Sequence, residues 1–350
     1  MEIRAANTSD NAGLLELTSL TPMKGAISLC IDRKPDFFGL LRYRGPYEVK
    51  VILEGSSIVG AFAASQQKNF LCGNCETIFY LADFKVHPDY RGTSVAVRLV
   101  RAMIDYLHEQ SADLLFCLVA DGNHRVFPFF QGRMGIPAWE EMGRFTVFQI
   151  IPSRTRSDKN LDIRQMAPEG FSIADYYQDY FLENYTVAPG IEANEFEQMV
   201  NLMLIHEGSV VAAISLIDMN PVKQTVVIDM PFWLKGMVYL SKRLHAALGW
   251  MILPGVGESI RMLNIRFWAY NQGHEWALKA LVQQARCIAA EEKHHFLSVG
   301  VQAQDPVGRL FGSFRNIPFT SKGFVTSLKN NSGKLKSILG GLFFEDYSMV

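Results

Sequence analysis

The stretch HPDYRGTSVA, residues 87–96, brings together residue types that can hold an anion. It lies between an apolar strand-like run and an amphipathic helix pattern, so its small residues would form the first turn of a helix. Such a turn leaves backbone N–H groups without partners and carries about half a positive charge. Arg91 adds a full charge, and Thr93 and Ser94 add hydroxyl donors. These residues predict a phosphate or pyrophosphate site, although they could form only a tight turn at Gly92 and an N-cap at Ser94.

Two acids lie on or beside the preceding strand-like run, residues 77–86. Asp83 is within the run and nearer the anion site, whereas Glu76 comes just before it. A carboxylate on this run could act as a general base toward a ligand bound at the anion site. The two acids are seven residues apart, so a regular strand sends them to opposite faces and only a bulge brings them together. We predict Asp83 as the first candidate for a catalytic base and Glu76 as the second, for which a solvated strand end is an alternative explanation.

The motifs around the anion site resemble those of one protein family. The lead-in Val-x-Pro-x-Tyr-Arg-Gly, residues 86–92, is followed by a helix, a strand and an Asn-bearing helix start at Asn123. Residues 91–96 follow the signature Arg/Gln-x-x-Gly-x-Gly/Ala, with Ser94 in place of the first glycine. In these features most of residues 1–150 resembles the GNAT acetyltransferase superfamily.

This resemblance implies a role for each part of the motif. The amides of the loop would bind the pyrophosphate of acetyl-coenzyme A or another acyl-coenzyme A, and the pantetheine arm would pair with the backbone of residues 84–86. Phe130 falls where the family pattern has the tyrosine that protonates the leaving thiolate, and phenylalanine has no proton to give. The predicted cofactor-binding residues are Phe84, Lys85, Val86, Arg91, Gly92, Thr93, Ser94, Val95, Ala96, Asn123 and Phe130.

The same series of predicted elements occurs twice along the chain. Residues 51–64 and 202–215 share an apolar run, Glu-Gly, a short polar step and a second apolar run, which is typical of an antiparallel hairpin. A strand, a helix and a strand then follow over residues 77–120 and again over 260–303. This order predicts an α/β fold of two tandem GNAT-like domains, each with a mixed, mostly antiparallel sheet and helices on both faces.

The length of 350 residues also fits two domains, each with its own core. We predict an acyl-coenzyme A-binding domain over 1–152, a polar linker over 153–160 and a degenerate GNAT-like domain over 161–330. Residues 331–350 would form a solvated, loosely ordered tail, because KNNSGK interrupts any long amphipathic helix there. A contact with an acidic partner, or with a membrane through 335–344, is the alternative.

The second repeat lacks the features of an anion site. Its corresponding turn, residues 271–277, has no Arg, and Glu275 carries a negative charge where the anion would lie. We therefore expect the second repeat to bind no coenzyme A at this turn and to help build an acceptor pocket between the halves.

The charge balance, the apolar runs and the cysteines of the chain indicate which classes of partner and which compartment to expect. Lys and Arg total 34 against 35 for Asp and Glu, so the net charge of −1 predicts no attraction to nucleic acid or membranes. The N-terminal residues lack a secretory signal pattern, and no apolar run approaches the ~20 residues that cross a bilayer. Five cysteines, with one CxxC at residues 72–75 and no second ligand pair, predict reduced thiols and no metal. These features together predict a cytoplasmic protein.

The sequence thus predicts an N-acyltransferase, acetyl-coenzyme A dependent or using another acyl-coenzyme A, in which a small-molecule or peptide amine attacks the thioester directly. Phe130 and Ser94 leave open a sensor that binds acyl-coenzyme A without turnover. Aminoacyl transfer, which also uses paired GNAT-like halves, is a third alternative, against which Arg91 argues. The acceptor, the acyl length and the oligomeric state are left open.

Overall fold

The computed structural model of the chain describes residues 1–22, 27–133, 137–155, 158–248 and 253–350. The first half contains β1 (Glu2–Ala5), the 3-10 helix η1 (Thr8–Asp10), α1 (Asn11–Ser19), β2 (Ser28–Asp32), α2 (Gly39–Arg44), β3 (Tyr47–Glu54), β4 (Ser57–Leu71), β5 (Asn74–Val86), η2 (Pro88–Tyr90), α3 (Val95–Glu109), β6 (Leu114–Ala120), η3 (His124–Phe130) and β7 (Glu140–Ile150). The second half contains β8 (Asp162–Arg164), α4 (Ile173–Asn184), β9 (Val187–Pro189), η4 (Ala193–Gln198), β10 (Val200–His206), β11 (Ser209–Asp218), β12 (Gln224–Asp229), α5 (Phe232–Leu248), β13 (Ser259–Ile260), β14 (Met262–Tyr270), α6 (Glu275–Glu291), β15 (Phe296–Gln302), α7 (Val307–Gly312), β16 (Asn316–Ser327) and α8 (Ser332–Leu339). Both predicted hairpins and both strand–helix–strand units are confirmed.

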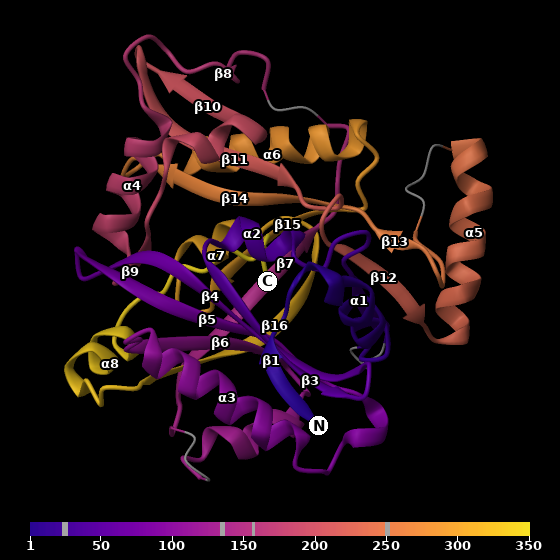
Figure 1. Cartoon of the computed structure of the whole chain (residues 1–350). Helices are drawn as coiled ribbons and strands as arrows, with labels where there is room; N and C mark the ends of the chain where they lie inside the picture. Colours follow the sequence, from indigo (N-terminus) through magenta and orange to yellow (C-terminus); the bar gives the residue numbers. More distant parts are fainter. Residues whose placement is uncertain (23–26, 134–136, 156–157, 249–252) are drawn as a thin grey trace.

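Within the described residues, the two halves share one mixed sheet of 13 strands (Figure 1). The strand order is β1-β3-β4-β5-β6-β16-β7-β15-β14-β11-β10-β8, and β9 pairs with β4. Most neighbours are antiparallel, and the parallel pairs are β5 with β6 and β14 with β15. The predicted α/β class, with a repeated order of elements and a mixed, mostly antiparallel sheet, is confirmed, and the two units are joined in one continuous sheet.

The two halves exchange their closing strands. β7, the last strand of the first half, pairs with β15 of the second half, and β16 pairs with β6 of the first half. β7 and β16 also pair with each other along most of their length. Each half therefore depends on the other for a complete sheet. The predicted domain boundaries stay a prediction, and residues 156–157 of the predicted linker lie outside the described residues.

Helices cover both faces of the first half of the sheet. Alternate residues of a strand point to opposite faces, and the cores follow this rule. Val51 and Ala61 are buried together with α1 and α2, whereas Ile52 and Phe62 are buried together with α3. The residues of α3 that face the sheet recur at helical spacing, as the sequence predicts: Val95, Leu99, Val100, Met103, Ile104 and Leu107.

The C-terminal segment is not the loosely ordered tail that the sequence predicts. Asn331, within the KNNSGK stretch, forms the N-cap of α8, where its side chain accepts a hydrogen bond from the backbone N–H of Lys334. Beyond α8 the chain enters the core, where Phe343 and Phe344 are buried and a backbone bridge joins Phe343 to Val187. The physical reason is the apolar pair Phe343–Phe344, whose burial outweighs the solvation of the few polar residues around it.

This packing is tight enough to be tested at one glycine. A methyl group on Gly300 of β15 would overlap the ring of Tyr347 from the C-terminal segment. Gly300→Ala should therefore lower the free energy of unfolding by about 1–3 kcal/mol, measured by urea denaturation. Gly236→Ala, in α5 with open space around the added methyl, is the control and should not destabilise the protein. An unchanged midpoint for Gly300→Ala would show that the C-terminal segment does not pack there.

Candidate functional site

Strands β5 and β6 separate partway along their length. They pair in parallel only over Ile78–Tyr80 and Leu114–Phe116, although β5 continues to Val86 and β6 to Ala120. Beyond Tyr80, the edge of β5 that faces β6 has no strand partner among the described residues. A backbone edge of this kind can pair with an extended ligand that carries amide groups.

A β-bulge lies at this opening. Ala61 of β4 pairs with Lys85 and Ala63 pairs with Ala82, so two residues of β5, Asp83 and Phe84, oppose one residue of β4. Asp83 has φ +53°, the left-handed conformation that aspartate tolerates better than most residues. Because the bulge shifts the alternation, Asp83 lies on the face of the sheet opposite α3.

The bulge puts Glu76 on the same face as Asp83 but does not bring the two acids together. Seven residues of strand span about 20 Å. Glu76 forms an ion pair with Lys334 of α8 at 2.7 Å, whereas Asp83 pairs with Arg33, which precedes α2, and with Lys85 of β5. The two predicted catalytic acids are therefore not parts of one site.

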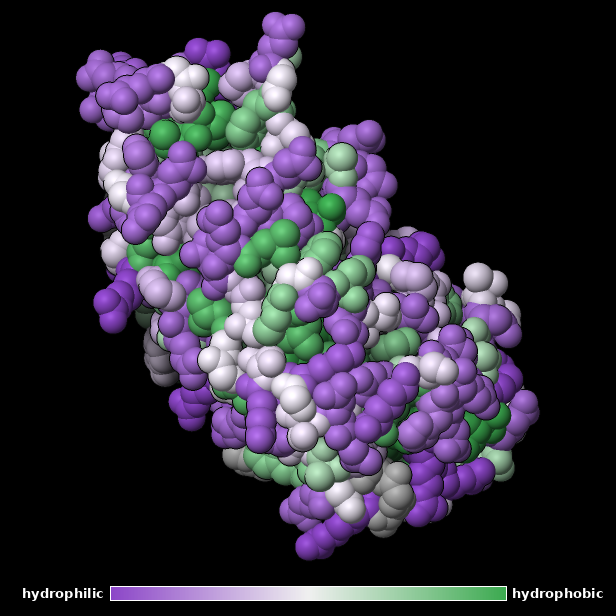
Figure 2. Space-filling view, turned by 90° about the vertical axis from the view of Figure 1, so that its left-hand side faces the viewer, coloured by the Kyte–Doolittle hydropathy of each residue, from purple (hydrophilic) through white to green (hydrophobic). Residues whose placement is uncertain are grey.

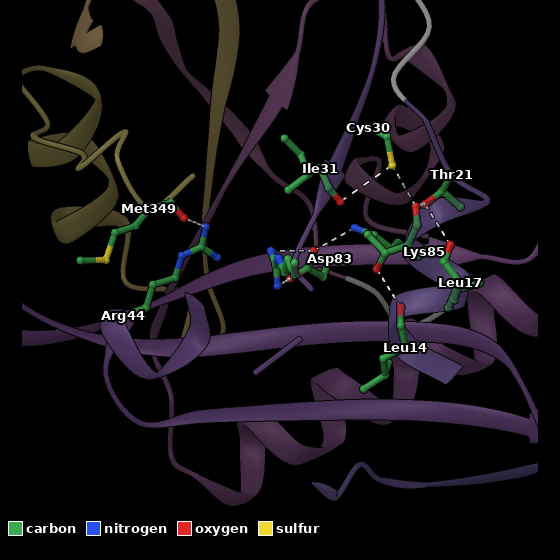
Figure 3. Close-up of polar contacts among 11 residues, drawn as sticks. Leu14, Leu17, Thr21, Cys30, Ile31, Arg44, Asp83, Lys85 and Met349 are labelled. Carbon is green, nitrogen blue, oxygen red and sulfur yellow. Dashed lines mark hydrogen bonds and ion pairs between the residues drawn. The ribbon is translucent and has the colours of Figure 1, made fainter. Parts of the chain in front are cut away.

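Asp83 is held by two cations. Arg33 Nη1 lies 2.7 Å from its Oδ2 and Lys85 Nζ lies 2.9 Å from its Oδ1. Burial alone would raise the pKa of Asp83, but the charges of Arg33, Lys85 and Arg44 outweigh this and hold the pKa well below its usual range. Figure 3 shows Lys85 directed toward Asp83. A carboxylate so stabilised in its charged form is a weak proton acceptor, which favours a structural and positioning role.

The turn between β5 and α3 has the features of an anion site. Gly92 has φ +80° and open space around its Cα, and Arg91 is exposed and forms no ion pair with any described residue. The hydroxyl of Thr93 is engaged with the Tyr90 carbonyl at 2.6 Å. The exposed N-cap Ser94 makes no side-chain cap hydrogen bond. In this turn, the backbone N–H groups of Gly92, Ser94, Ala96 and Val97 have no hydrogen-bond partner among the described residues.

This turn begins directly after the open edge of β5. The same chain segment therefore offers strand-like backbone groups at residues 81–86 and helix N-terminal amides at residues 92–97. Val95 is fully buried and anchors the start of α3, so the amides are held on a rigid element. The predicted residues from Phe84 to Ala96 thus lie along one continuous chain segment, and their role in binding coenzyme A stays a prediction.

Asn123 and Phe130 lie on the far side of the opening. Asn123 is exposed and precedes η3, a 3-10 helix that contains Pro128, and not the helix start that the sequence predicts. A proline within this segment removes a backbone donor and disfavours an α-helix. Phe130 packs against Phe324 of β16, with ring centroids 4.5 Å apart. The ring that contacts β5 is that of Phe129, 5.3 Å from Phe84.

A cavity of about 470 Å³ lies between the two halves. Its walls come from parts of residues 42–46, 66–69, 189–198, 266–267 and 344–349. Arg44 on its wall lies 4.5 Å from the ring centroid of Tyr80, the residue at which β5 and β6 separate. The cavity and the opening therefore share the layer of side chains around Arg44 and Tyr80. Figure 3 shows Arg44 extending toward the backbone of Met349, to which it donates a hydrogen bond.

The acids on this cavity differ in their partners. Asp346 and Glu195 both bind Arg266, with 2.6 Å between Arg266 Nε and Asp346 Oδ2. Glu345 is 5% exposed, forms no ion pair within the described residues, and its Oε1 has no hydrogen-bond partner there. Burial raises the pKa of Glu345 well above its usual value, with Asp346 adding to this and Arg44 opposing it. A buried carboxyl with a raised pKa is suited to take up and release a proton.

Lys223 lies in the same buried layer. Its Nζ donates to the backbone oxygen of Val350 at 2.5 Å. Burial, together with the charges of Arg44 and Arg33, lowers the pKa of Lys223 to about 7. Sequence reasoning missed both Glu345 and Lys223, because neither lies near the loop motif and nothing local marks them as buried.

Other candidate sites are weaker. Among the described residues, no cluster of His, Cys, Asp or Glu could hold a metal ion. A second cavity of about 500 Å³ is lined by β7, β15 and α7, away from the anion-site turn.

The corresponding turn of the second repeat differs from the anion-site turn. Its Gly273 has φ +80° like Gly92, but Glu275 occupies the first turn of α6. Figure 2, which views the side of α4 and β9, shows a mostly hydrophilic face with small separate hydrophobic patches.

Comparison with known proteins concerns the fold of the chain and the family of its first half. Residues 25–136 match the model of the acetyltransferase (GNAT) family. No curated protein sequence matches the chain significantly. The chain is similar in fold to a crystal structure of Saccharomyces cerevisiae N-myristoyltransferase with bound myristoyl-CoA: the TM-score is 0.61, the identity is 10%, and 93% of this chain and 82% of that one are covered.

A structure of the same yeast enzyme with myristoyl-CoA and inhibitors gives a TM-score of 0.59 at 10% identity, covering 93% of this chain and 79% of that one. At this identity the likeness concerns the fold. Residues 25–136 of the chain match the GNAT family, and the second unit, which repeats the order of elements, lacks the arginine of the first.

Proposed function

We propose that the protein transfers an acyl group from acyl-coenzyme A to the amine of an acceptor. The observation that carries this proposal is that the open backbone edge of β5, residues 81–86, leads directly into the free amides of residues 92–97. The pantetheine arm would pair with the open edge, and the pyrophosphate would lie against the amides and Arg91. Acetyl-coenzyme A is the simplest donor, and a longer acyl chain would use the same contacts.

The cavity between the halves would hold the acceptor. Its wall residue Arg44 contacts Tyr80, where β5 and β6 separate, so the acceptor amine would reach the thioester from this side of the opening. The amine nitrogen attacks the thioester carbon, a C–N bond forms, the C–S bond breaks and coenzyme A leaves as its thiolate. Holding both reactants in one layer of side chains would supply much of the rate.

The base for this step is better assigned to Glu345 than to Asp83 or Glu76. Asp83 is held by Arg33 and Lys85, and Glu76 is bound to Lys334 away from the opening. Glu345 lines the acceptor cavity and has an oxygen without a partner. Its raised pKa lets it accept the proton that the amine loses on attack.

The pyrophosphate contact is tested by Arg91→Glu. Replacing the exposed cation by an acid should weaken coenzyme A binding by about 10–100-fold, since charged hydrogen bonds contribute about 1.5–3 kcal/mol. Isothermal titration with coenzyme A measures the effect. Arg154→Glu makes the same charge change at an exposed position outside the site and should leave the affinity unaltered. Equal affinities of the Arg91 variant and the wild type would place coenzyme A elsewhere.

A sensor that binds acyl-coenzyme A without turnover is the second candidate. Phe130, at the position where the family pattern has a tyrosine, packs on Phe324 and offers no proton to a leaving thiolate. Incubation of the protein with acetyl-coenzyme A and a library of amines separates the two functions. Release of free thiol with any amine supports transfer, whereas tight binding with no release from any amine supports the sensor.

A further inference from the structure

The second half contains an insertion with no counterpart in the first half. In the first half, β4 and β5 are joined by a two-residue turn, Cys72–Gly73. The corresponding strands of the second half, β11 and β14, are separated by residues 219–261, which contain β12, α5 and β13. Figure 1 shows α5 at the outer edge of the molecule, beyond β12 and β13.

The inner face of α5 is well packed. Val238 and Leu234 lie in a small core with Val227 and Met230, over the sheet of β13, β12 and β2. Ser241 is also buried, and its hydroxyl binds the Val238 carbonyl. These buried residues attach α5 to the small sheet, and the opposite side of the helix does not take part in this packing.

The outer face of α5 is apolar and exposed. The exposed fractions are 90% for Phe232, 66% for Trp233, 51% for Met237, 61% for Tyr239 and 54% for Leu240. On a helix these positions, together with Gly236, fall on one side of the axis. Exposed apolar clusters of this kind on soluble surfaces are uncommon and mark contacts with a partner or a lipid surface.

The charges on α5 are of one sign. The helix sequence FWLKGMVYLSKRLHAAL has Lys235, Lys242 and Arg243 and no acid, in a chain whose net charge is −1. Arg243 is exposed and stacks on Tyr239, with 5.2 Å from its guanidinium carbon to the ring centroid, so it borders the apolar face. Lys235 is bound to Asp229.

Apolar aromatic residues flanked by cations are the composition of helices that lie in the interface of anionic membranes. Trp and Tyr suit this position, because their rings have an apolar body and a polar group. A second copy of the chain fits less well, since two symmetric copies of this face would bring helices with cations and no acids together. No helix of the described residues is long and apolar enough to span a membrane, so the contact would be peripheral.

We propose that α5 docks the protein on an anionic lipid surface through Phe232, Trp233, Met237 and Leu240, with Arg243 at the headgroups. This departs from the sequence-based expectation of no membrane contact, which rested on the balanced charge of the whole chain and not on one helix. The proposal is independent of the acyltransferase function.

The test is co-sedimentation of the full chain with vesicles of phosphatidylcholine containing phosphatidylserine. The wild type should sediment with these vesicles and at least tenfold less with phosphatidylcholine alone. The double substitution Phe232→Ser and Trp233→Ser should reduce sedimentation by about 10-fold or more, and Arg243→Glu should reduce it only on anionic vesicles. Both aromatic residues are mostly exposed, so the fold should survive, which circular dichroism checks.

The matched control is Trp276→Ser, a tryptophan on α6 with 42% exposure, which should not alter sedimentation. Light scattering of the protein without lipid tests the alternative that a second copy of the chain covers the outer face of α5. A wild type that does not sediment, or a control that loses binding as fully as the α5 variant, overturns the proposal. A concentration-dependent dimer that the α5 substitutions dissociate, without vesicle binding, assigns the face to a second copy instead.

Discussion

Asp83→Asn should lower the free energy of unfolding by about 3–5 kcal/mol, the cost typical of removing one partner from a buried ion pair. Asn keeps the size of the side chain and tolerates the left-handed backbone at φ +53°, so the loss is one of charge. It leaves Arg33, which is 5% exposed, without the carboxylate that it faces at 2.7 Å. Urea denaturation at neutral pH measures the effect.

The pH dependence of this difference has a definite sign. The folded state lowers the pKa of Asp83, so the ion pair contributes its full stability above the unfolded pKa, about 3.9, and loses it as the pH falls through the lower folded value. The gap between wild type and Asp83→Asn should therefore be constant near neutrality and shrink in acid.

The double variant Arg33→Met with Asp83→Asn provides the control. It removes both buried charges, so it should recover much of the stability that Asp83→Asn alone loses. Additive losses in the double variant would contradict the ion pair. A stable Asp83→Asn protein with greatly reduced kcat would instead support Asp83 as the catalytic base, which the sequence predicts and the geometry disfavours.

Glu345→Gln should reduce kcat by about 10²–10⁴-fold, the contribution typical of a general base. The substitution keeps the shape and removes the proton-accepting carboxylate from the wall of the acceptor cavity. Coenzyme A affinity should not change, because the anion-site turn is formed by residues 91–97. Thiol release from acetyl-coenzyme A with an accepting amine, together with titration of coenzyme A, separates the two effects.

The pH profiles give a second readout for Glu345. Only the ionised carboxylate accepts a proton, and its pKa is raised, so the activity of the wild type should increase with pH through a value well above that of an ordinary glutamate. A raised folded pKa also means that this group's contribution to stability is full below the unfolded pKa, about 4.3, and is lost as the pH rises from there to the folded value; Glu345→Gln should lack this loss.

Glu197→Gln, at an exposed acid of η4 that does not line the cavity, is the matched control and should retain activity. Full activity in Glu345→Gln would assign the proton to another group, with Lys223, whose pKa is lowered to about 7, as the next to examine.

The sequence by itself determined the local parts of this protein. The spacing of Val95, Leu99 and Met103 predicted α3, and Glu-Gly between two apolar runs predicted both hairpins, because such elements depend on neighbours within a few residues. The turn at residues 91–96 was found in the same way. The order of these elements, which occurs twice, indicates the fold.

Only the tertiary structure decided which distant segments meet. The exchange of β7 and β16 between the halves, the burial of Phe343 and Phe344, and the placing of Glu345 on the acceptor cavity all join residues far apart in the chain. Strand pairing and burial between such distant residues produce no short-range pattern in the sequence from which they could be predicted. Asp83 shows the consequence, since its position beside the loop suggested a base, whereas Arg33, 50 residues earlier, fixes its charge.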